Sequence, residues 1–294
     1  MREKINDTKL HTLIHNLKRV HSQQKACKVL GISRSSYYAA SKKEKTPTEI
    51  RREEISAEIK KIHAESKETY GAPKIHAILM RKYIVCSLKY VQKLMKDSQI
   101  RSNVTKKYKP QSTGSGTVAT APNLLQQNFS TEMICEKIAG DITYIYTSDY
   151  GWCYLASFLD LHSNEICGWD FSKKMTTELV LSALKKASIK CGKNLSGAII
   201  HTDQGTQYTS KDYMAKVLEI DCKLSYSRRG NPYDNACIES FHSVLKKEMI
   251  YQENPRPFEE TQKALFEYIE GWYNTRRIQK KLGYLSPYEF KEVS

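Results

Sequence analysis

The chain lacks any apolar run long enough to cross a membrane, since nowhere in its 294 residues do about 18 apolar residues follow one another. The first ten residues, MREKINDTKL, include basic side chains but lead into no apolar segment, so a secretory signal is not indicated. These two absences lead us to expect a cytosolic protein.

A C-x-x-C pair is also missing. The eight cysteines are scattered, which argues against a zinc knuckle and against a disulfide framework. We therefore expect most of them to be small buried apolar side chains. They are Cys27, Cys86, Cys135, Cys153, Cys167, Cys191, Cys222 and Cys237.

Negative charge is scarce in the first half of the chain. The whole sequence has 47 Lys and Arg against 32 Asp and Glu, but residues 1–135 hold 26 basic and 11 acidic residues, while residues 136–294 hold 21 of each. The excess is either a solvated helical surface or a nucleic-acid-binding region, and its size favours the second. Membrane binding is less favoured because the basic residues spread over several expected helices.

The first 45 residues have the pattern of short helices separated by a turn. Apolar residues recur at helical spacing over residues 8–20, a second set at 26–30 ends at Gly31, and Ser33 is placed to cap a third helix. This order is typical of a helix-turn-helix, although another small helical bundle would look similar. In a helix-turn-helix, the residues placed to reach DNA are Arg34, Ser35, Ser36 and Tyr37.

A second helical block is expected over residues 46–108. Ile55, Ile59 and Ile62 mark one helix, Pro73 suits the first turn of another, and Ser87 can cap a third. Residues 109–131 then contain almost no charge and read as a flexible connection. We expect a domain boundary there.

Beyond residue 132 the pattern changes to that of a mixed α/β domain. Three short runs rich in β-branched and aromatic residues, at 141–147, 150–160 and 165–172, predict consecutive antiparallel strands. Helices and strands alternate after them, with a compact apolar strand ending near residue 203. The last part of the chain is expected to be helical.

Three acids stand out in this half. Asp141 is expected at the start of the first strand, Asp203 at the end of a buried strand, and Glu239 in a helix that begins near Asp234. Taken singly, each is more simply a capping, turn or solvated residue. Together they indicate a site for divalent cations, which bind oxygen ligands and, as a pair, catalyse phosphodiester chemistry.

The sequence around these acids resembles a known family. The motifs GDITYI at Asp141, HTDQGTQY at Asp203 and NPYDNACIESF at Glu239, with 35 residues between the last two acids, resemble the DDE transposases of bacterial insertion sequences and retroviral-type integrases. The most similar group is the orfB-type transposases of insertion-sequence family three, and the resemblance covers nearly the whole chain.

Two further segments fit this family, and two positions depart from it. TYGAPKIHAILMRK resembles its helix-turn-helix-like segment, and WYNTRRIQKKLGYLSPYEF its terminal pattern. Ala139 stands where the family commonly has Trp, and Gln279 or Lys280 where it commonly has His. Neither position is a metal ligand in the family, so the departures concern packing or DNA contact.

The resemblance implies a fold and a reaction. We expect an α/β RNase H-like catalytic core with a mixed five-stranded sheet, preceded by all-α helix-turn-helix modules and followed by a C-terminal helical region. Asp141, Asp203 and Glu239 would hold two Mg²⁺ ions, with Mn²⁺ able to substitute, for 3′-end cleavage and strand transfer of DNA.

Several basic and polar residues are candidates for DNA contact. Lys246, seven positions after Glu239 and on the same helical face, is expected to grip a phosphate. Arg228 and Arg229 are expected to steady DNA, with simple solvation as the alternative. Asn235 is expected to orient Glu239 or touch DNA, unless it serves only as a helix cap.

The expected domains are a helix-turn-helix-like module at 1–45, a second helical DNA-binding module at 46–108, a linker at 109–131, the catalytic core at 132–250 and a helical extension at 251–294. The expected partners are double-stranded DNA, namely terminal inverted repeats and target DNA, and further copies of the chain. In the resembling family, an upstream helix-turn-helix and leucine-zipper segment is commonly fused to such a chain. We expect a protein with these partners to be cytoplasmic and to associate with the nucleoid when it is bound to DNA.

Three other functions compete with this one. A DNA-binding regulator without catalysis would tolerate loss of an acid, and this sequence keeps all three. A retroviral integrase proper needs a His pair and a C-x-x-C pair for its zinc domain, and the Cys pair is missing. An RNase H-like nuclease would hydrolyse DNA without joining it.

Overall fold

The structure, a computed structural model, describes residues 23–29, 31, 33, 35, 45–104 and 121–294. It divides into two compact units, Met1–Glu58 and Ile59–Ser294. The expected helix at 8–20, the candidate DNA-contact residues Arg34, Ser36 and Tyr37, and most of the expected linker lie outside the described residues.

The helices of the N-terminal half begin at the residues that local capping favours. Helix α2 spans Gln23–Val29, and α4 spans Pro47–Glu65. At the start of α4, Thr46 Oγ1 accepts a hydrogen bond from the Glu49 backbone N at 3.2 Å, and the Glu49 carboxylate accepts one from the Thr46 backbone N at 2.8 Å. This reciprocal pair is a capping box, which satisfies two backbone donors that a helix start leaves open.

Two shorter helices follow in the second unit, α5 at Ala72–Arg81 and α6 at Leu88–Asp97. Pro73 lies in the first turn of α5, and Ser87 Oγ accepts a hydrogen bond from the Tyr90 backbone N. Both expectations from the sequence are confirmed. The apolar faces are buried against one another through Ile75, Leu79, Val91 and Leu94.

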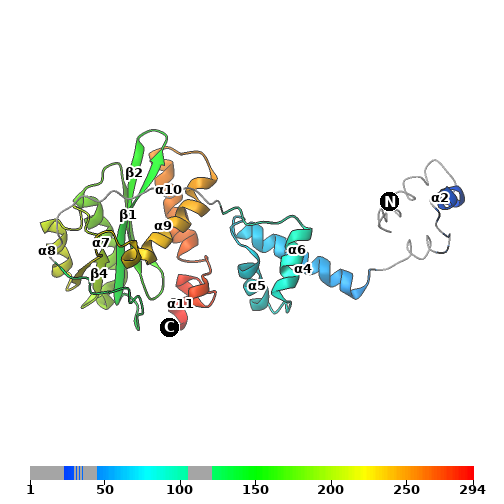
Figure 1. The fold of residues 1–294 in the computed structure, drawn as a ribbon, viewed down its shortest axis with the longest axis horizontal. Helices are drawn as coiled ribbons and strands as arrows, with labels where there is room; N and C mark the ends of the chain where they lie inside the picture. The colour runs from blue at the N-terminus through cyan, green and yellow to red at the C-terminus, as the bar shows by residue number, and fades with distance from the viewer. Residues whose placement is uncertain (1–22, 30, 32, 34, 36–44, 105–120) are drawn as a thin grey trace. The chain divides into compact units, whose positions relative to one another are not determined.

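A five-stranded mixed sheet forms the centre of the C-terminal half, as expected (Figure 1). Strands β1, β2 and β3 form an antiparallel meander, while β4 and β5 run parallel to β1, in the order β3-β2-β1-β4-β5. Their bounds are Lys137–Thr147 for β1, Gly151–Asp160 for β2, Ile166–Ser172 for β3, Ile199–Thr202 for β4 and Lys223–Tyr226 for β5.

Helices cover both faces of this sheet, with α7 and α8 on one side and α9 and α10 on the other (Figure 1). Helix α7 packs closely on β3 because Gly168 has no side chain, since a Cβ there would lie 2.3 Å from the Ala183 carbonyl oxygen. The bounds are Thr177–Cys191 for α7, Lys211–Glu219 for α8, Ala236–Glu248 for α9 and Phe258–Tyr268 for α10. Short helices lie at Gly192–Leu195 (η1), Pro232–Asn235 (η2) and Ile250–Gln252 (η3).

The C-terminal segment is held by a buried ion pair. After α10 the chain continues through η4 (Ile269–Tyr273), η5 (Lys280–Leu282) and α11 (Pro287–Val293). Arg277 donates from Nε and Nη2 to the two oxygens of Glu248 at the end of α9, both at 2.8 Å. The Tyr70 hydroxyl accepts a hydrogen bond from the Ile278 backbone N at 2.9 Å, which joins this segment to the residues after α4.

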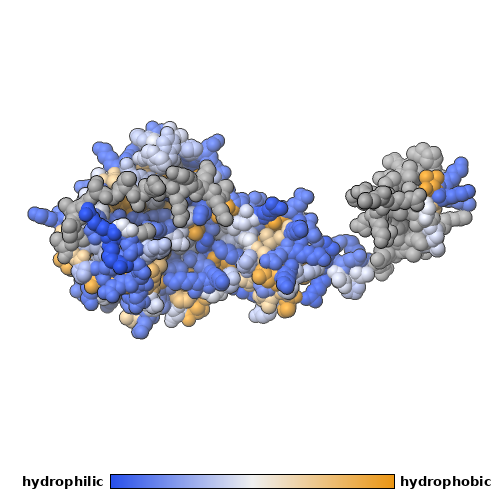
Figure 2. All heavy atoms as spheres, viewed as in Figure 1, coloured by the Kyte–Doolittle hydropathy of each residue, from blue (hydrophilic) through white to orange (hydrophobic). Residues whose placement is uncertain are grey.

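The surface is mostly hydrophilic on the face that Figure 2 shows, with hydrophobic atoms in small separate patches. Within the described part of the chain, no helix combines the length and apolar character needed to span a bilayer.

Two expectations from the sequence were wrong in detail. Asp141 is the fifth residue of β1 rather than its start, because the strand begins at Lys137 and pairs there with β4. Cys135 and Cys191 form a disulfide across 56 positions of sequence. The fold brings the segment before β1 beside the end of α7, a long-range proximity that cysteine spacing does not reveal. The remaining described cysteines are free, and Cys27, Cys153, Cys167 and Cys222 are buried, as expected.

Candidate active site

Asp141 and Asp203 lie on neighbouring parallel strands. Asp141 is in β1, and Asp203 follows directly after the last residue of β4. Because β1 and β4 pair in parallel, the end of β4 reaches the level of the middle of β1. The Asp141 side chain is 19% exposed. The topology therefore brings together two of the three acids singled out in the sequence.

The two carboxylates influence each other. The pKa of Asp203 is raised to about 6, first by burial among surrounding atoms and then by the nearby Asp141 carboxylate, while a hydrogen bond from the Gly205 backbone N at 3.0 Å opposes the shift. Asp203 still keeps exposed surface, so it is only partly desolvated. A pair of acids that repel each other in this way is stabilised by a cation between them.

Helix α9 runs along these acids with one stripe of polar residues. Asn235, Glu239, His242 and Lys246 follow one another at spacings of three or four, which places them on one helical face. Asn235 Nδ2 donates to the Gly140 carbonyl oxygen at 3.3 Å, and His242 Nδ1 lies 3.3 Å from Asp141 Oδ2. Glu239 lies between Asn235 and His242 along the stripe, and it is exposed.

Lys246, at the far end of the stripe, is not the solvated lysine that its position in the sequence alone would allow. Burial lowers the pKa of Lys246, and the Asp141 carboxylate opposes that change. A cationic side chain thus lies within electrostatic reach of the first acid.

The loop before α9 is built around Asp234, which has no exposed surface. Its carboxylate accepts hydrogen bonds from Arg228 Nε at 3.0 Å and Nη2 at 2.8 Å, and from the Arg228 backbone N at 2.9 Å. Asn123 and Gln127 donate to it at 2.9 and 3.0 Å. The Arg228 side chain, followed by these other donors, holds the pKa of Asp234 far below its usual range.

These contacts change how several candidate residues are understood. Arg228 pairs with Asp234 although its side chain is 59% exposed, and Arg229 is exposed as well. Asn235 begins α9 but makes no capping hydrogen bond through its side chain, so the capping alternative is not supported. Ser35 is exposed, with its hydroxyl 2.9 Å from that of Ser33. A role for any of them in DNA contact stays a prediction.

Two residues of the site were missed in the sequence. His242 lies three positions after Glu239, and that helical spacing was a usable signal. Asp234 was noted only as the start of a helix, and nothing in its local sequence indicated that distant amides would surround it.

The donor set is suited to a hard cation, since carboxylate oxygens are the preferred ligands of Mg²⁺. As the side chains stand, no three His, Cys, Asp or Glu residues in the described ranges meet closely enough to hold one ion. The Asp141–Asp203 pair is the part of the set that the structure brings together.

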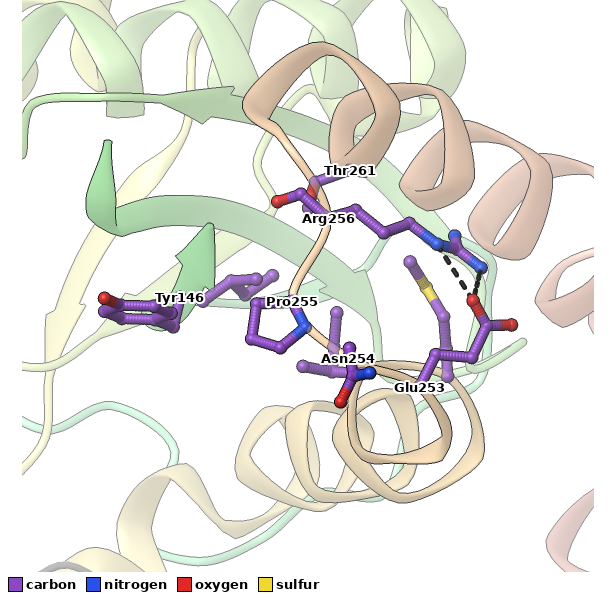
Figure 3. Close-up of a pocket in the computed structure, with 9 residues that line it drawn as sticks. Tyr146, Glu253, Asn254, Pro255, Arg256 and Thr261 are labelled. Atoms are coloured by element: carbon purple, nitrogen blue, oxygen red, sulfur yellow. Dashed lines mark hydrogen bonds and ion pairs between the residues drawn. The ribbon is translucent and has the colours of Figure 1, made fainter. Parts of the chain in front are cut away.

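A small cavity lies elsewhere, where the residues after α9 cross the end of β1 (Figure 3). Ile145, Tyr146 and Pro255 line it, and Arg256 Nε donates to Glu253 Oε2 at 3.1 Å beside it. Its lining does not include the three acids, so it is separate from the candidate site.

Comparisons with known proteins agree with this geometry. Residues 135–232 and 239–294 match two models of an integrase core domain, and residues 49–108 match an HTH-like domain. The chain is 38% identical to the transposase for insertion sequence element IS904 of Lactococcus lactis subsp. lactis over 249 residues, which is 84% of this chain and 96% of that protein. The chain belongs to the transposases of insertion-sequence family three.

Other relatives support the same assignment. This transposase is 35% identical to the transposase InsF for insertion sequence IS3A of Escherichia coli K12, over 90% of this chain and 92% of that one. It is 34% identical to the insertion element IS600 31 kDa protein of Shigella sonnei, over 90% and 97%. The predicted family and the predicted integrase-like core are therefore confirmed. The chain is a polynucleotidyl transferase that also contains an HTH-like domain.

Two solved structures are similar at low sequence identity. A simian T-cell lymphotropic virus intasome in complex with PP2A regulatory subunit B56γ matches with a TM-score of 0.45 and 15% identity, over 79% of this chain and 73% of that one. The HTLV-2 integrase catalytic core in complex with magnesium matches with a TM-score of 0.40 and 19% identity, over 59% and 99%.

Proposed function

We propose that Asp141, Asp203 and Glu239 are the catalytic acids of this transposase and that they hold two Mg²⁺ ions, which Mn²⁺ can replace. The observation that carries this proposal is the parallel pairing of β1 and β4, which places Asp141 and Asp203 level with each other beside the α9 stripe that contains Glu239. Three oxygen-donor side chains from two strands and one helix match the requirement of two-metal phosphodiester chemistry.

The reaction is hydrolysis at the 3′ end of the element, followed by in-line attack of the freed 3′-OH on a phosphodiester of target DNA. The bound ions supply the charge stabilisation that two approaching anions need. Lys246, near Asp141, binds a phosphate close to the scissile end, and Arg229 adds a second, exposed positive charge. Asn235 fixes the start of α9 against β1 through Gly140 and so keeps Glu239 at the level of Asp141.

The other parts of the chain bind and assemble. The segments at 1–45 and 46–108, which hold the excess positive charge, capture terminal repeats and target DNA, and the enzyme works as a homo-oligomer on DNA. Residues 109–131 link these modules to the core at 132–250, and the segment at 251–294 supports α9. The transposase acts in the bacterial cytoplasm, on the nucleoid when bound to DNA, and cooperates with an upstream helix-turn-helix and leucine-zipper protein.

The assignment is tested by Glu239→Gln in the full-length protein. The substrate is a labelled duplex with a pre-cleaved end, taken from the DNA that flanks the gene, and the assay follows joined products in Mg²⁺. We expect strand transfer to be lost, while Glu219→Gln on the exposed part of α8 leaves it unchanged. Wild-type joining by Glu239→Gln would show that this residue is not catalytic.

The same assay separates the competing functions. A nuclease without joining activity would give only hydrolysis products from the wild-type protein. A regulator without catalysis would bind the duplex and give no product of either kind.

A further inference from the structure

We infer that His242, supported by Ser157, is a positioning residue that fixes the orientation of the Asp141 carboxylate for cation binding. The observation behind this is a chain of three side chains from three elements. His242 Nδ1 lies 3.3 Å from Asp141 Oδ2, and His242 Nε2 lies 2.7 Å from Ser157 Oγ. The inference rests on the proposed function, in which Asp141 is a metal ligand.

The sheet register explains why these groups meet. Asp141 of β1 and Ser157 of β2 are directly paired, and directly paired residues of antiparallel strands point to the same face of the sheet. That face is covered by α9, and His242 projects from α9 toward both residues. The imidazole ring therefore contacts the acid with one nitrogen and the serine with the other.

Burial makes this arrangement rigid. His242 is 5% exposed and Ser157 is fully buried, so neither exchanges its partner for bulk water. The Phe241 and His242 rings lie 5.5 Å apart, and Phe241 in turn packs against Tyr273. The imidazole is fixed both by its polar contacts and by the packing of α9.

The chemistry of the three groups defines their roles. A carboxylate only accepts hydrogen bonds, so the nitrogen that faces Asp141 is the one that carries a proton. In the neutral ring the other nitrogen is an acceptor, and the Ser157 hydroxyl can donate to it. The Asp141 carboxylate thereby favours the tautomer with the proton on Nδ1, and Ser157, whose hydroxyl can donate or accept, holds the other nitrogen in place.

The consequence concerns the geometry of cation binding. A carboxylate has two oxygens, and the contact through Oδ2 would limit rotation of the Asp141 side chain, which together with Asp203 would hold a cation. Removing a group that orients a metal ligand typically weakens metal binding 10- to 100-fold. His242 would thus act on metal affinity through Asp141 without being a ligand itself.

The experiment measures Mn²⁺ binding to the full-length protein by isothermal titration calorimetry, without DNA. We expect His242→Phe, which keeps ring volume but has no donor, to weaken Mn²⁺ binding by about 10-fold or more. We expect His242→Asn, whose amide N takes nearly the position of Nδ1, to stay within about threefold of wild type. Ser243→Ala, one residue further along α9, is the matched control and leaves affinity unchanged.

Ser157→Ala tests the second link. It is expected to weaken Mn²⁺ binding by about threefold in the wild-type background. It should have no further effect in the His242→Phe background, because Ser157 acts on Asp141 only through the His242 imidazole, which that variant lacks. Should His242→Phe fail to fold, Ser157→Ala against wild type decides, and an unchanged affinity for that variant contradicts the inference.

Two further results would overturn the inference. Wild-type affinity in His242→Phe would mean that Asp141 needs no such support, and equal losses in His242→Phe and His242→Asn would mean that ring packing, rather than the donor, matters. Asp141→Asn separates this from the proposed function. If that variant binds Mn²⁺ as wild type does, Asp141 is not a ligand and the functional assignment itself fails.

Discussion

The Asp234 cluster provides the sharpest test of how the loop before α9 is held. Asp234→Asn keeps the shape of the side chain but replaces one carboxylate oxygen by an NH₂ group. Oδ2 accepts from Asn123 Nδ2 and from the backbone N and Nε of Arg228, and Oδ1 accepts from Gln127 Nε2 and Arg228 Nη2. Whichever oxygen the NH₂ group replaces, it is a donor placed opposite other donors, so at least two hydrogen bonds are lost.

The size of the effect follows from these losses. Hydrogen bonds to a charged group contribute about 1.5–3 kcal/mol each, and at least two are lost, while the Arg228 side chain is 59% exposed and can be hydrated once the pair is broken. We therefore expect Asp234→Asn to lower the free energy of unfolding by about 3–5 kcal/mol. For a domain of this size, that corresponds to a fall in Tm on the order of 10 °C.

Thermal unfolding of the purified protein at neutral pH is the assay, with Asp212→Asn on the exposed first turn of α8 as the matched control. Because the folded-state pKa of Asp234 is lowered, its contribution is present above the ordinary Asp value of about 3.9 and is lost as the pH falls below it. The difference in stability between wild type and Asp234→Asn should therefore be constant from about pH 5 to pH 8. A fall in Tm no larger than that of Asp212→Asn would refute the reasoning.

Three other outcomes are expected. Arg277→Met leaves the Glu248 carboxylate buried without its partner and should lower the free energy of unfolding by about 3 kcal/mol, measured by urea denaturation. Reduction of the Cys135–Cys191 disulfide, which closes a loop of 56 positions, should lower the free energy of unfolding by up to about 4 kcal/mol and so lower Tm. The Tm of Cys135→Ser should not change when reductant is added. Burial lowers the pKa of His201 to about 4. The resulting contribution to the free energy of unfolding, about 3 kcal/mol, is present above pH 6.5 and is lost as the pH falls toward 4. His201→Gln should therefore flatten this part of the profile of stability against pH.

Much of the catalytic half was predictable because its signals are local. The three runs of β-branched and aromatic residues formed β1, β2 and β3, and the apolar run before Asp203 formed β4. In the N-terminal half, Pro73 lies in the first turn of α5 and Ser87 caps α6, as their side chains favour. Such signals depend on a residue and its near neighbours in sequence, which a single chain displays directly.

The contacts that the sequence did not predict are long-range. The His242–Ser157 contact joins residues 85 positions apart, and the Asn123–Asp234 contact joins residues 111 apart. Which distant side chain will satisfy a buried polar group depends on sheet register and helix placement. Spacing on α9 could have indicated that His242 shares a face with Glu239, but its partners needed the paired strands β1 and β2.

The equal numbers of acidic and basic residues in the catalytic half are accompanied by ion pairs within the fold. Several of its basic side chains form such pairs, although Arg228 and Lys186 stay 59% and 52% exposed in theirs. The pairs are Arg228 with Asp234, Arg277 with Glu248, Lys186 with Asp170, Lys190 with Glu165 and Glu270, and Lys291 with Glu165.

A core of this kind attracts DNA weakly from a distance, because paired charges produce little net field beyond about 10 Å at ordinary salt. The proposal that the N-terminal half captures DNA fits its charge, since basic residues outnumber acids by 26 to 11 up to residue 135. In the proposed site the charges act at short range, since the Asp141 carboxylate acts on both Lys246 and Asp203. Under these two proposals, the division of charge along the chain separates the capture of DNA from the binding of cations.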